Sequence, residues 1–154
     1  MTMTNDQAVD HLQKLLGTVR DGETGFKEAA ETADAASLKT LFQGRAAQRA
    51  TLATELETKI TALGGEPRER GSVGAALHRT WLNVRDAVTG RDDYAVVAEA
   101  ERGEDVAISN YQDALNEADL PSDLRAFVQN QYDQVKASHD EIRDLKHSME
   151  ADKK

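Results

Sequence analysis

The sequence contains no cysteine, which excludes disulfides, thiolate zinc sites, iron–sulfur clusters and a cysteine nucleophile. Proline (2 residues) and aromatic residues (5%) are also scarce, and this disfavours a sandwich or barrel with many turns. Positive charge is in deficit: 19 Lys and Arg stand against 28 Asp and Glu. The net charge of −9 repels phosphates and anionic lipid, so we expect neither nucleic acid nor a membrane as a partner.

Long apolar runs are missing as well. No window holds about 18 consecutive apolar residues, and the first ten residues lack the basic and apolar stretches of a signal peptide. We therefore expect a cytoplasmic protein. The 154 residues match the size of one domain, and 39% hydrophobic with 31% charged residues suits long solvated helices. The composition predicts a single all-α domain over residues 1–154.

Turn-forming residues are concentrated near residues 34–37, 64–74, 89–93 and 119–122. Between these places, apolar residues recur at alternating steps of four and three, the spacing of one helical stripe. This spacing predicts helices over about residues 5–33, 37–63, 72–88, 93–118 and 121–149. The four long helices form an antiparallel four-helix bundle of two hairpins, and the short amphipathic helix is the crossover between them. We expect the crossover to bury Trp81; a dimer contact is the alternative.

An internal repeat supports the two-hairpin arrangement. Residues 38–43 match residues 124–129 at an offset of 86. The same offset relates Gln48, Glu55 and Leu56 to Gln134, Glu141 and Ile142. The pair Gly22-Glu23 is echoed more faintly by Gly103-Glu104.

Polar residues occupy stripe positions that the heptad pattern would fill with Leu or Ile. Counted from the turns, they stand at similar heights, so we expect a polar layer across the middle of the bundle. Its expected members are Glu23, Arg45, Gln48, Arg49, Glu101, Glu104, Gln131 and His139. The same count places His139 level with Glu101.

Buried carboxylates need compensation, because the desolvation of an unpaired charge is costly. Two compensations remain open. Arg45 and Arg49 can pair with Glu23 and Glu104, which makes the layer structural and requires no cofactor. Alternatively, carboxylates and an imidazole from separate helices can bind iron, manganese or zinc. The ligands expected for that metal are Glu23, Glu101, Glu104 and His139.

Four runs of residues carry a family resemblance. They are Asp21-Gly22-Glu23, Ala46-Ala47-Gln48-Arg49, His78-x-x-Trp81 and Glu99-Ala100-Glu101-Arg102-Gly103-Glu104-Asp105. Through them the chain resembles, over about residues 6–148, the bacterial ferritin-like family of unknown function called domain of unknown function 2383. The resemblance implies a ferritin-like bundle whose role is uncharacterised or stress-related. We expect such a bundle to associate through its helical faces as a homo-oligomer, for example a dimer.

The resemblance also bears on metal chemistry. Ferritin-like di-iron enzymes use one Glu from each of two helices and a Glu-x-x-His from each of the other two. Glu23 and Glu104 match the lone Glu positions, but Arg45-x-x-Gln48 and Gln131-x-x-Gln134 stand where Glu-x-x-His is expected. Arginine brings positive charge into such a site, which argues against a conventional di-iron centre. The residues favour a non-enzymatic bundle; a metal-binding protein with redox or storage activity is the alternative.

Overall fold

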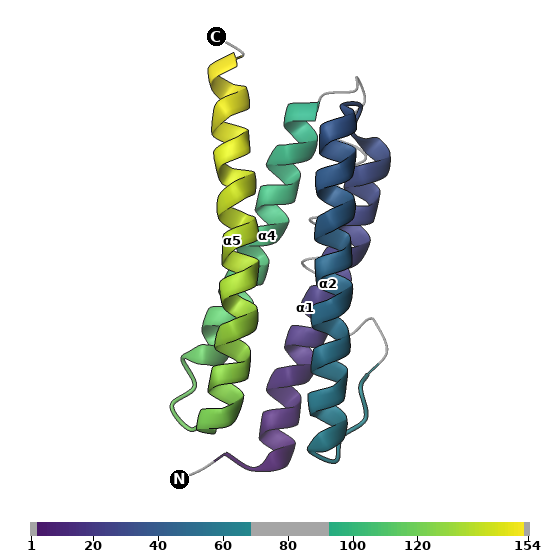
Figure 1. Ribbon diagram of the computed structural model, residues 1–154. Coiled ribbons are helices and arrows are strands. Elements are labelled where there is room, and N and C mark those ends of the chain that lie inside the picture. The colour runs from purple at the N-terminus through teal and green to yellow at the C-terminus, as the bar shows by residue number, and fades with distance from the viewer. Residues whose placement is uncertain (1–2, 69–92, 153–154) are drawn as a thin grey trace.

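The computed structural model describes residues 3–68 and 93–152, which form four long α-helices (Figure 1). The helices are α1 (Asn5–Thr32), α2 (Ala36–Ala62), α4 (Asp93–Leu115) and α5 (Ser122–Asp152). The four long helices predicted from the sequence are confirmed, with ends that differ by a few residues. The predicted crossover helix and its Trp81 lie outside the described residues. Within the described part of the chain, no helix is both long enough and apolar enough to cross a membrane.

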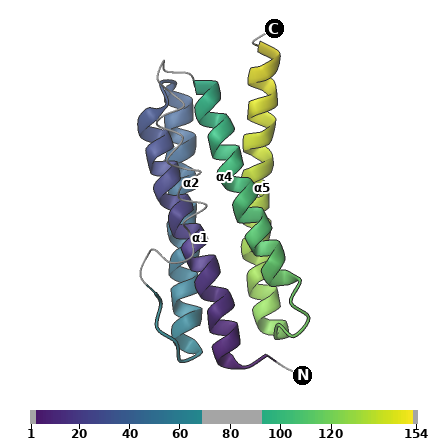
Figure 2. The same ribbon diagram turned by 180° about the vertical axis from the view of Figure 1, so that it is seen from behind.

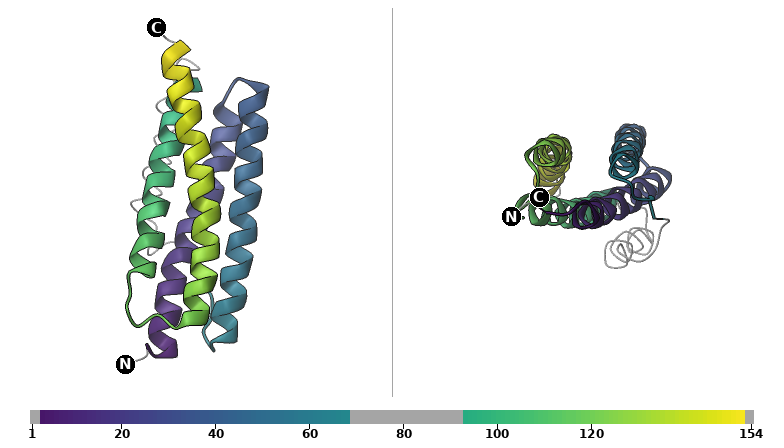
Figure 3. Two further views of the ribbon diagram at one scale, coloured as in Figure 1. Left: turned by 60° about the vertical axis from the view of Figure 1, so that its left-hand side comes forward. Right: turned by 90° about the horizontal axis from the view of Figure 1, so that it is seen from below.

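The four helices lie along a common axis as a bundle (Figures 1 and 2). α2 runs antiparallel to α1, and α5 runs antiparallel to α4. α4 begins at the end of the bundle where α1 finishes, so the directions in chain order are up, down, down and up. Seen along the axis, α1 and α4 lie side by side, while α2 and α5 form the opposite side (Figure 3).

Backbone groups at the helix ends are satisfied by identifiable side chains. Thr4 and Gln7 form a capping box at the start of α1, in which the hydroxyl of Thr4 accepts from the backbone N–H of Gln7. The residue before α2, Ala35, has no capping side chain. Instead, the carboxylate of Asp93 accepts from the backbone N–H groups of Asp34 at 2.8 Å and Ala35 at 3.0 Å. This contact ties the start of α4 to the turn between α1 and α2.

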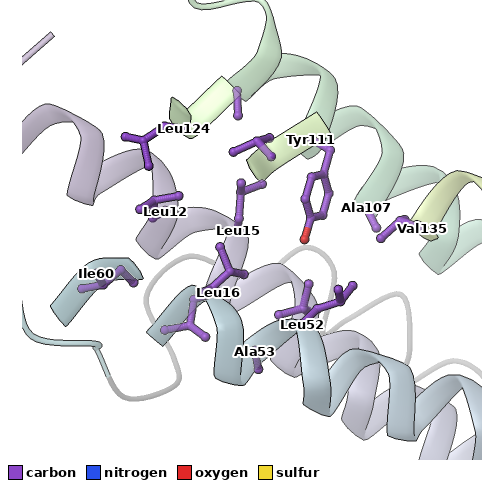
Figure 4. Packing of buried hydrophobic residues seen from close by; sticks show 14 of the residues in the cluster. Leu12, Leu15, Leu16, Leu52, Ala53, Ile60, Ala107, Tyr111, Leu124 and Val135 are labelled. Carbon is purple, nitrogen blue, oxygen red and sulfur yellow. The ribbon is translucent and has the colours of Figure 1, made fainter. Parts of the chain in front are cut away.

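The buried apolar residues form two clusters, one towards each end of the bundle. The first contains Leu16, Leu52 and Tyr111 (Figure 4), and the second contains the stacked rings of Phe26 and Phe42. Between them, no buried residue of either cluster comes from residues 20–25 of α1, 47–51 of α2, 101–106 of α4 or 136–141 of α5. The core is therefore interrupted at one height on all four helices.

Candidate functional site

An ion pair between Arg49 on α2 and Glu104 on α4 lies at the centre of this interruption. Each side chain is 1% exposed. Arg49 also donates to Oε1 of Gln48, and its guanidinium lies 5.3 Å from the centre of the Phe26 ring on α1. A carboxylate, an amide oxygen and an aromatic face thus hold one guanidinium in place.

Gly22 on α1 provides the space that Arg49 occupies. A Cβ atom at Gly22 would lie 3.3 Å from Nε of Arg49 and 3.5 Å from its Cγ and Cδ. Because glycine has no Cβ, the arginine can pass close to the backbone of α1 on its way to Glu104. The glycine of the run Asp21-Gly22-Glu23 is therefore a packing requirement of the ion pair.

Glu23 does not join this pair. Its carboxylate binds Nζ of Lys27 at 2.8 Å, one turn along α1, and its side chain is 25% exposed. Glu23 lines an open groove of about 620 Å³ formed by residues of α1 and α2. The repeat explains why Glu23 has no arginine partner in the core. Glu23 corresponds to Glu104, which pairs with Arg49 of the other hairpin. The residue that corresponds to Arg49 at the offset of 86 is Val135 on α5, which carries no charge.

Arg45 also differs from the expectation, because it pairs with Glu141 on α5 and not with Glu23 or Glu104. The exposed fractions of the two side chains, 18% and 65%, place this pair at the edge of the bundle. The equivalent residues of the repeat, Gln131 and Glu55, are also in contact: Nε2 of Gln131 donates to Oε1 of Glu55 at 3.1 Å. The internal duplication therefore appears as two matching bridges between α2 and α5.

Gln131 on α5 is fully buried and belongs to a second polar cluster, together with Tyr111 of α4. The hydroxyl of Tyr111 donates to its Oε1 at 2.7 Å, and its Nε2 also donates to the carbonyl of Leu52 at 3.2 Å. Burial raises the pKa of Tyr111, against the opposing effect of Arg49, so the phenol stays protonated and remains a donor. Figure 4 shows its hydroxyl pointing towards Leu52.

His139 joins α5 to α4 beside the ion pair. Its Nε2 lies 2.7 Å from Oδ1 of Asp105, and its Nδ1 lies 3.1 Å from Oδ1 of Asp140. Burial lowers the pKa of His139, but the hydrogen bonds to Asp140 and Asp105 and the nearby charge of Glu104 outweigh it and raise the pKa above 6.5. Because both ring nitrogens face carboxylate oxygens, the geometry suits the imidazolium, which donates from both.

The partner of His139 corrects the expectation that it stands level with Glu101. His139 meets Asp105, one turn further along α4, and Glu101 meets Nζ of Lys146 at 3.4 Å. Helical side chains lean towards the N-terminus of their own helix. On antiparallel helices, two side chains that lean towards each other therefore meet between residues whose backbones stand at different heights.

These contacts separate the four side chains expected to bind a metal. Each of Glu23, Glu101, Glu104 and His139 is engaged by a different charged neighbour. Among residues 3–68 and 93–152, no group of three or more His, Cys, Asp or Glu side chains is placed to hold a metal ion. As the described residues stand, their donor set does not fit a ferritin-like metal centre.

Several buried polar atoms near the layer have no hydrogen-bond partner. Among the described residues they are Nε of Arg45, Oε2 of Glu99, Oε2 of Glu101, Oε2 of Glu104 and Oγ of Ser138. Sequence reasoning did not single out Ser138 or Tyr111. The repeat contained a signal for Ser138, because the equivalent residue at the offset of 86 is Leu52. Nothing in the sequence pattern marked Tyr111 as part of a polar cluster, because a tyrosine at a stripe position is typical of an ordinary apolar core.

Comparison with known proteins places the chain in a family. A model described as a domain of unknown function, DUF2383, matches residues 7–117. None of the curated proteins matches the chain. A solved two-domain protein from Anabaena variabilis, containing DJ-1/ThiJ/PfpI-like and ferritin-like domains, is 22% identical with a TM-score of 0.76. The match covers 96% of this chain and 41% of that protein, so the chain spans less than half of its length. The likeness shows a ferritin-like fold, and the chain belongs to the DUF2383 family.

Proposed function

We propose that this protein is a non-enzymatic helical module of the cytoplasm, whose buried polar layer fixes the alignment of its helices and holds no metal. The observation that carries the proposal is the Arg49–Glu104 pair, 1% exposed on both sides and lying between two apolar clusters. Arginine is charged at every physiological pH. At the height where a ferritin-like site would gather carboxylates, α2 therefore supplies a permanent cation that neutralises the carboxylate of α4.

A buried pair of this kind selects one register. If α2 slipped by one turn against α4, Arg49 and Glu104 would each be left buried without a partner, which costs about 3–5 kcal/mol. The apolar layers above and below discriminate less, because aliphatic side chains accept many neighbours of similar volume. The ion pair thus fixes how α2 is aligned with α4, and this is the property that a structural module requires.

We further propose that the module acts by association, as a homo-oligomer with a stress-related role. The association rests on the expectation that a bundle of this kind pairs through its helical faces; the Anabaena variabilis protein shows only that a domain of this fold occurs joined to a DJ-1/ThiJ/PfpI-like domain. The stress-related role rests on the family resemblance. Size-exclusion chromatography with light scattering on the full chain measures the association directly; a monomer at all concentrations would contradict this part.

Elemental analysis tests the absence of metal. The full chain is purified without chelators, then incubated with Fe(II), Mn(II) or Zn(II) and freed of excess metal. We expect far less than one equivalent of each metal, and oxidation of Fe(II) no faster than in buffer. One or more equivalents of bound metal that disappear in Glu104→Gln, with the helical content retained, would overturn the proposal.

A further inference from the structure

From the spacing of residues along α4 and α5, we infer that Ser138 and Glu104 lie opposite each other. The hydrogen bond from Tyr111 to Gln131 marks one level at which these helices face each other. Glu104 lies seven residues before Tyr111, and Ser138 lies seven residues after Gln131. Because the helices are antiparallel, both steps of two turns lead in the same direction along the bundle. They bring Glu104 and Ser138 to the same level on the same seam.

Both residues are buried and incompletely bonded. Glu104 is 1% exposed and Ser138 is 2% exposed. One carboxylate oxygen of Glu104 binds Arg49, whereas Oε2 of Glu104 and Oγ of Ser138 have no partner. At one level of the bundle, a hydroxyl donor and a carboxylate acceptor that both lack a partner suit one small molecule, which accepts from the hydroxyl and donates to the carboxylate.

The neighbours of Glu104 on its face of α4 are small. Ala100 and Ala107 flank Glu104 along the same face of the helix, and both are buried. Their methyl groups fill little of the volume beside the carboxylate. On α5, Ser138 is itself the small residue where the repeat has leucine at residue 52.

The charges nearby decide the chemical class of the ligand. Arg49 compensates Glu104, and Lys146 compensates Glu101 one turn away. The neighbouring imidazole, His139, is bound by two aspartates. A cation gains little where the carboxylates already have partners, so a neutral molecule with donor and acceptor groups fits best. Water meets these requirements, since buried waters occupy polar sites with two to four partners.

We propose that one ordered water molecule bridges Oγ of Ser138 and Oε2 of Glu104 as a built-in part of the polar layer. The proposal rests on the proposed function in one respect, that no metal occupies this level. The water lets both oxygens of Glu104 be satisfied at once, one by Arg49 and one by solvent. α4 and α5 then meet at this level through a solvent molecule.

A crystal structure of the full chain, at a resolution at which water molecules are placed reliably, tests the site directly. We expect solvent density within hydrogen-bonding distance of Oγ of Ser138 and Oε2 of Glu104, without anomalous scattering. A direct hydrogen bond between these two side chains, with no solvent beside it, would overturn the inference and leave the Arg49–Glu104 proposal standing. Anomalous scattering from a metal at this position would overturn both.

Oxygen-17 magnetic relaxation dispersion, which counts long-lived internal waters, tests the site in solution. Ser138→Val removes the hydroxyl and fills the space, so the count is expected to fall by one. Ser148→Val, at an exposed position of the same helix, is the matched control and should leave the count unchanged. An unchanged count in a folded Ser138→Val variant would contradict the inference.

Discussion

Arg49 of α2 passes over the bare backbone of Gly22 on α1, where a Cβ atom would stand 3.3 Å from its Nε. Beyond that point its guanidinium reaches Glu104 on α4. The side chain of Arg49 thus connects three helices: it belongs to α2, packs against the backbone of α1 and is neutralised by a carboxylate of α4. The stability of the layer depends on the fit at each of these contacts.

The ion pair predicts a marked asymmetry between single and double substitutions. Arg49→Met leaves the carboxylate of Glu104 buried without a counter-charge, so we expect a loss of about 3–5 kcal/mol in the free energy of unfolding. Arg49→Met combined with Glu104→Leu removes both charges, and should recover the wild-type stability or exceed it by about 1–4 kcal/mol. Urea unfolding followed by circular dichroism measures both. A double variant as unstable as the single one would contradict the assignment of the loss to an unpaired charge.

Arg45 provides the control for that experiment. Its partner Glu141 is 65% exposed, so water replaces the lost contact when the pair is broken. We expect Arg45→Met to change the free energy of unfolding by less than about 1 kcal/mol. Equal losses from Arg45→Met and Arg49→Met would show that burial does not separate the two arginines.

Gly22 and Gly44 form a matched pair for testing the packing of Arg49. A Cβ at Gly44 meets nothing within 4 Å, so Gly44→Ala should stabilise α2 by about 0.5–1 kcal/mol through its higher helix propensity. Gly22→Ala gains the same propensity but presses on a fixed guanidinium, and overpacking costs about 1–3 kcal/mol. We expect Gly22→Ala to be the less stable of the two by that amount. In an Arg49→Ala background the difference should vanish; if it persists, another neighbour of Gly22 causes it.

Tyr111 and Tyr132 allow the second polar cluster to be tested in the same way. Tyr111→Phe leaves Oε1 of Gln131 buried without a donor, which costs about 1–3 kcal/mol. Tyr132 accepts a hydrogen bond from Gln112 at the surface, so Tyr132→Phe should cost less than about 0.5 kcal/mol. Thermal and urea unfolding measure the difference. A negligible cost for Tyr111→Phe would mean that Gln131 finds another donor.

The four helices and the height of the interruption were readable from the sequence, because both depend on spacing along a single helix. Apolar residues recur until a polar residue takes a stripe position, and this happens near Glu23, Arg49, Glu104 and His139. Each of these lies in the interval between the two apolar clusters. Arg45 and Gln131, also expected in the layer, lie just outside it and bridge α2 to α5.

The choice of partners was not readable, because it depends on where long side chains reach. Glu23 turns to Lys27, and Arg45 turns to Glu141, by side-chain rotations that leave no trace in the periodicity. Each long side chain has several staggered rotamers, and the spacing of residues along a helix does not decide which of them is adopted. Ser138 was missed for a related reason: one small polar residue in an apolar stripe is common, and only its burial without a hydrogen-bond partner makes it informative.

The contacts of His139 predict how stability depends on pH. Burial lowers the pKa of His139, but the hydrogen bonds that its ring donates to Asp140 and Asp105 outweigh this effect and raise the pKa above 6.5 in the folded protein. A group whose pKa is raised by folding contributes stability that is complete below its unfolded pKa and is lost as pH rises through its folded pKa. The difference in free energy of unfolding between the wild type and His139→Gln should therefore fall as pH is raised above 6.5.

Asp140 sets the acid side of the same dependence. Hydrogen bonds from Lys136 and His139 lower its pKa from 3.8 to about 2, so its contribution is complete above 3.8 and is lost as pH falls towards 2. The cluster should thus stabilise the hairpin of α4 and α5 fully between these limits, from pH 3.8 to 6.5. Titration of the His139 ring by NMR checks the cause: its pKa should lie above 6.5 in the wild type and fall in Asp105→Asn. If the pKa of His139 stays the same in Asp105→Asn, the contact with Asp105 on α4 does not cause the raised pKa. The remaining causes would then be Asp140, on the same helix, and the charge of Glu104.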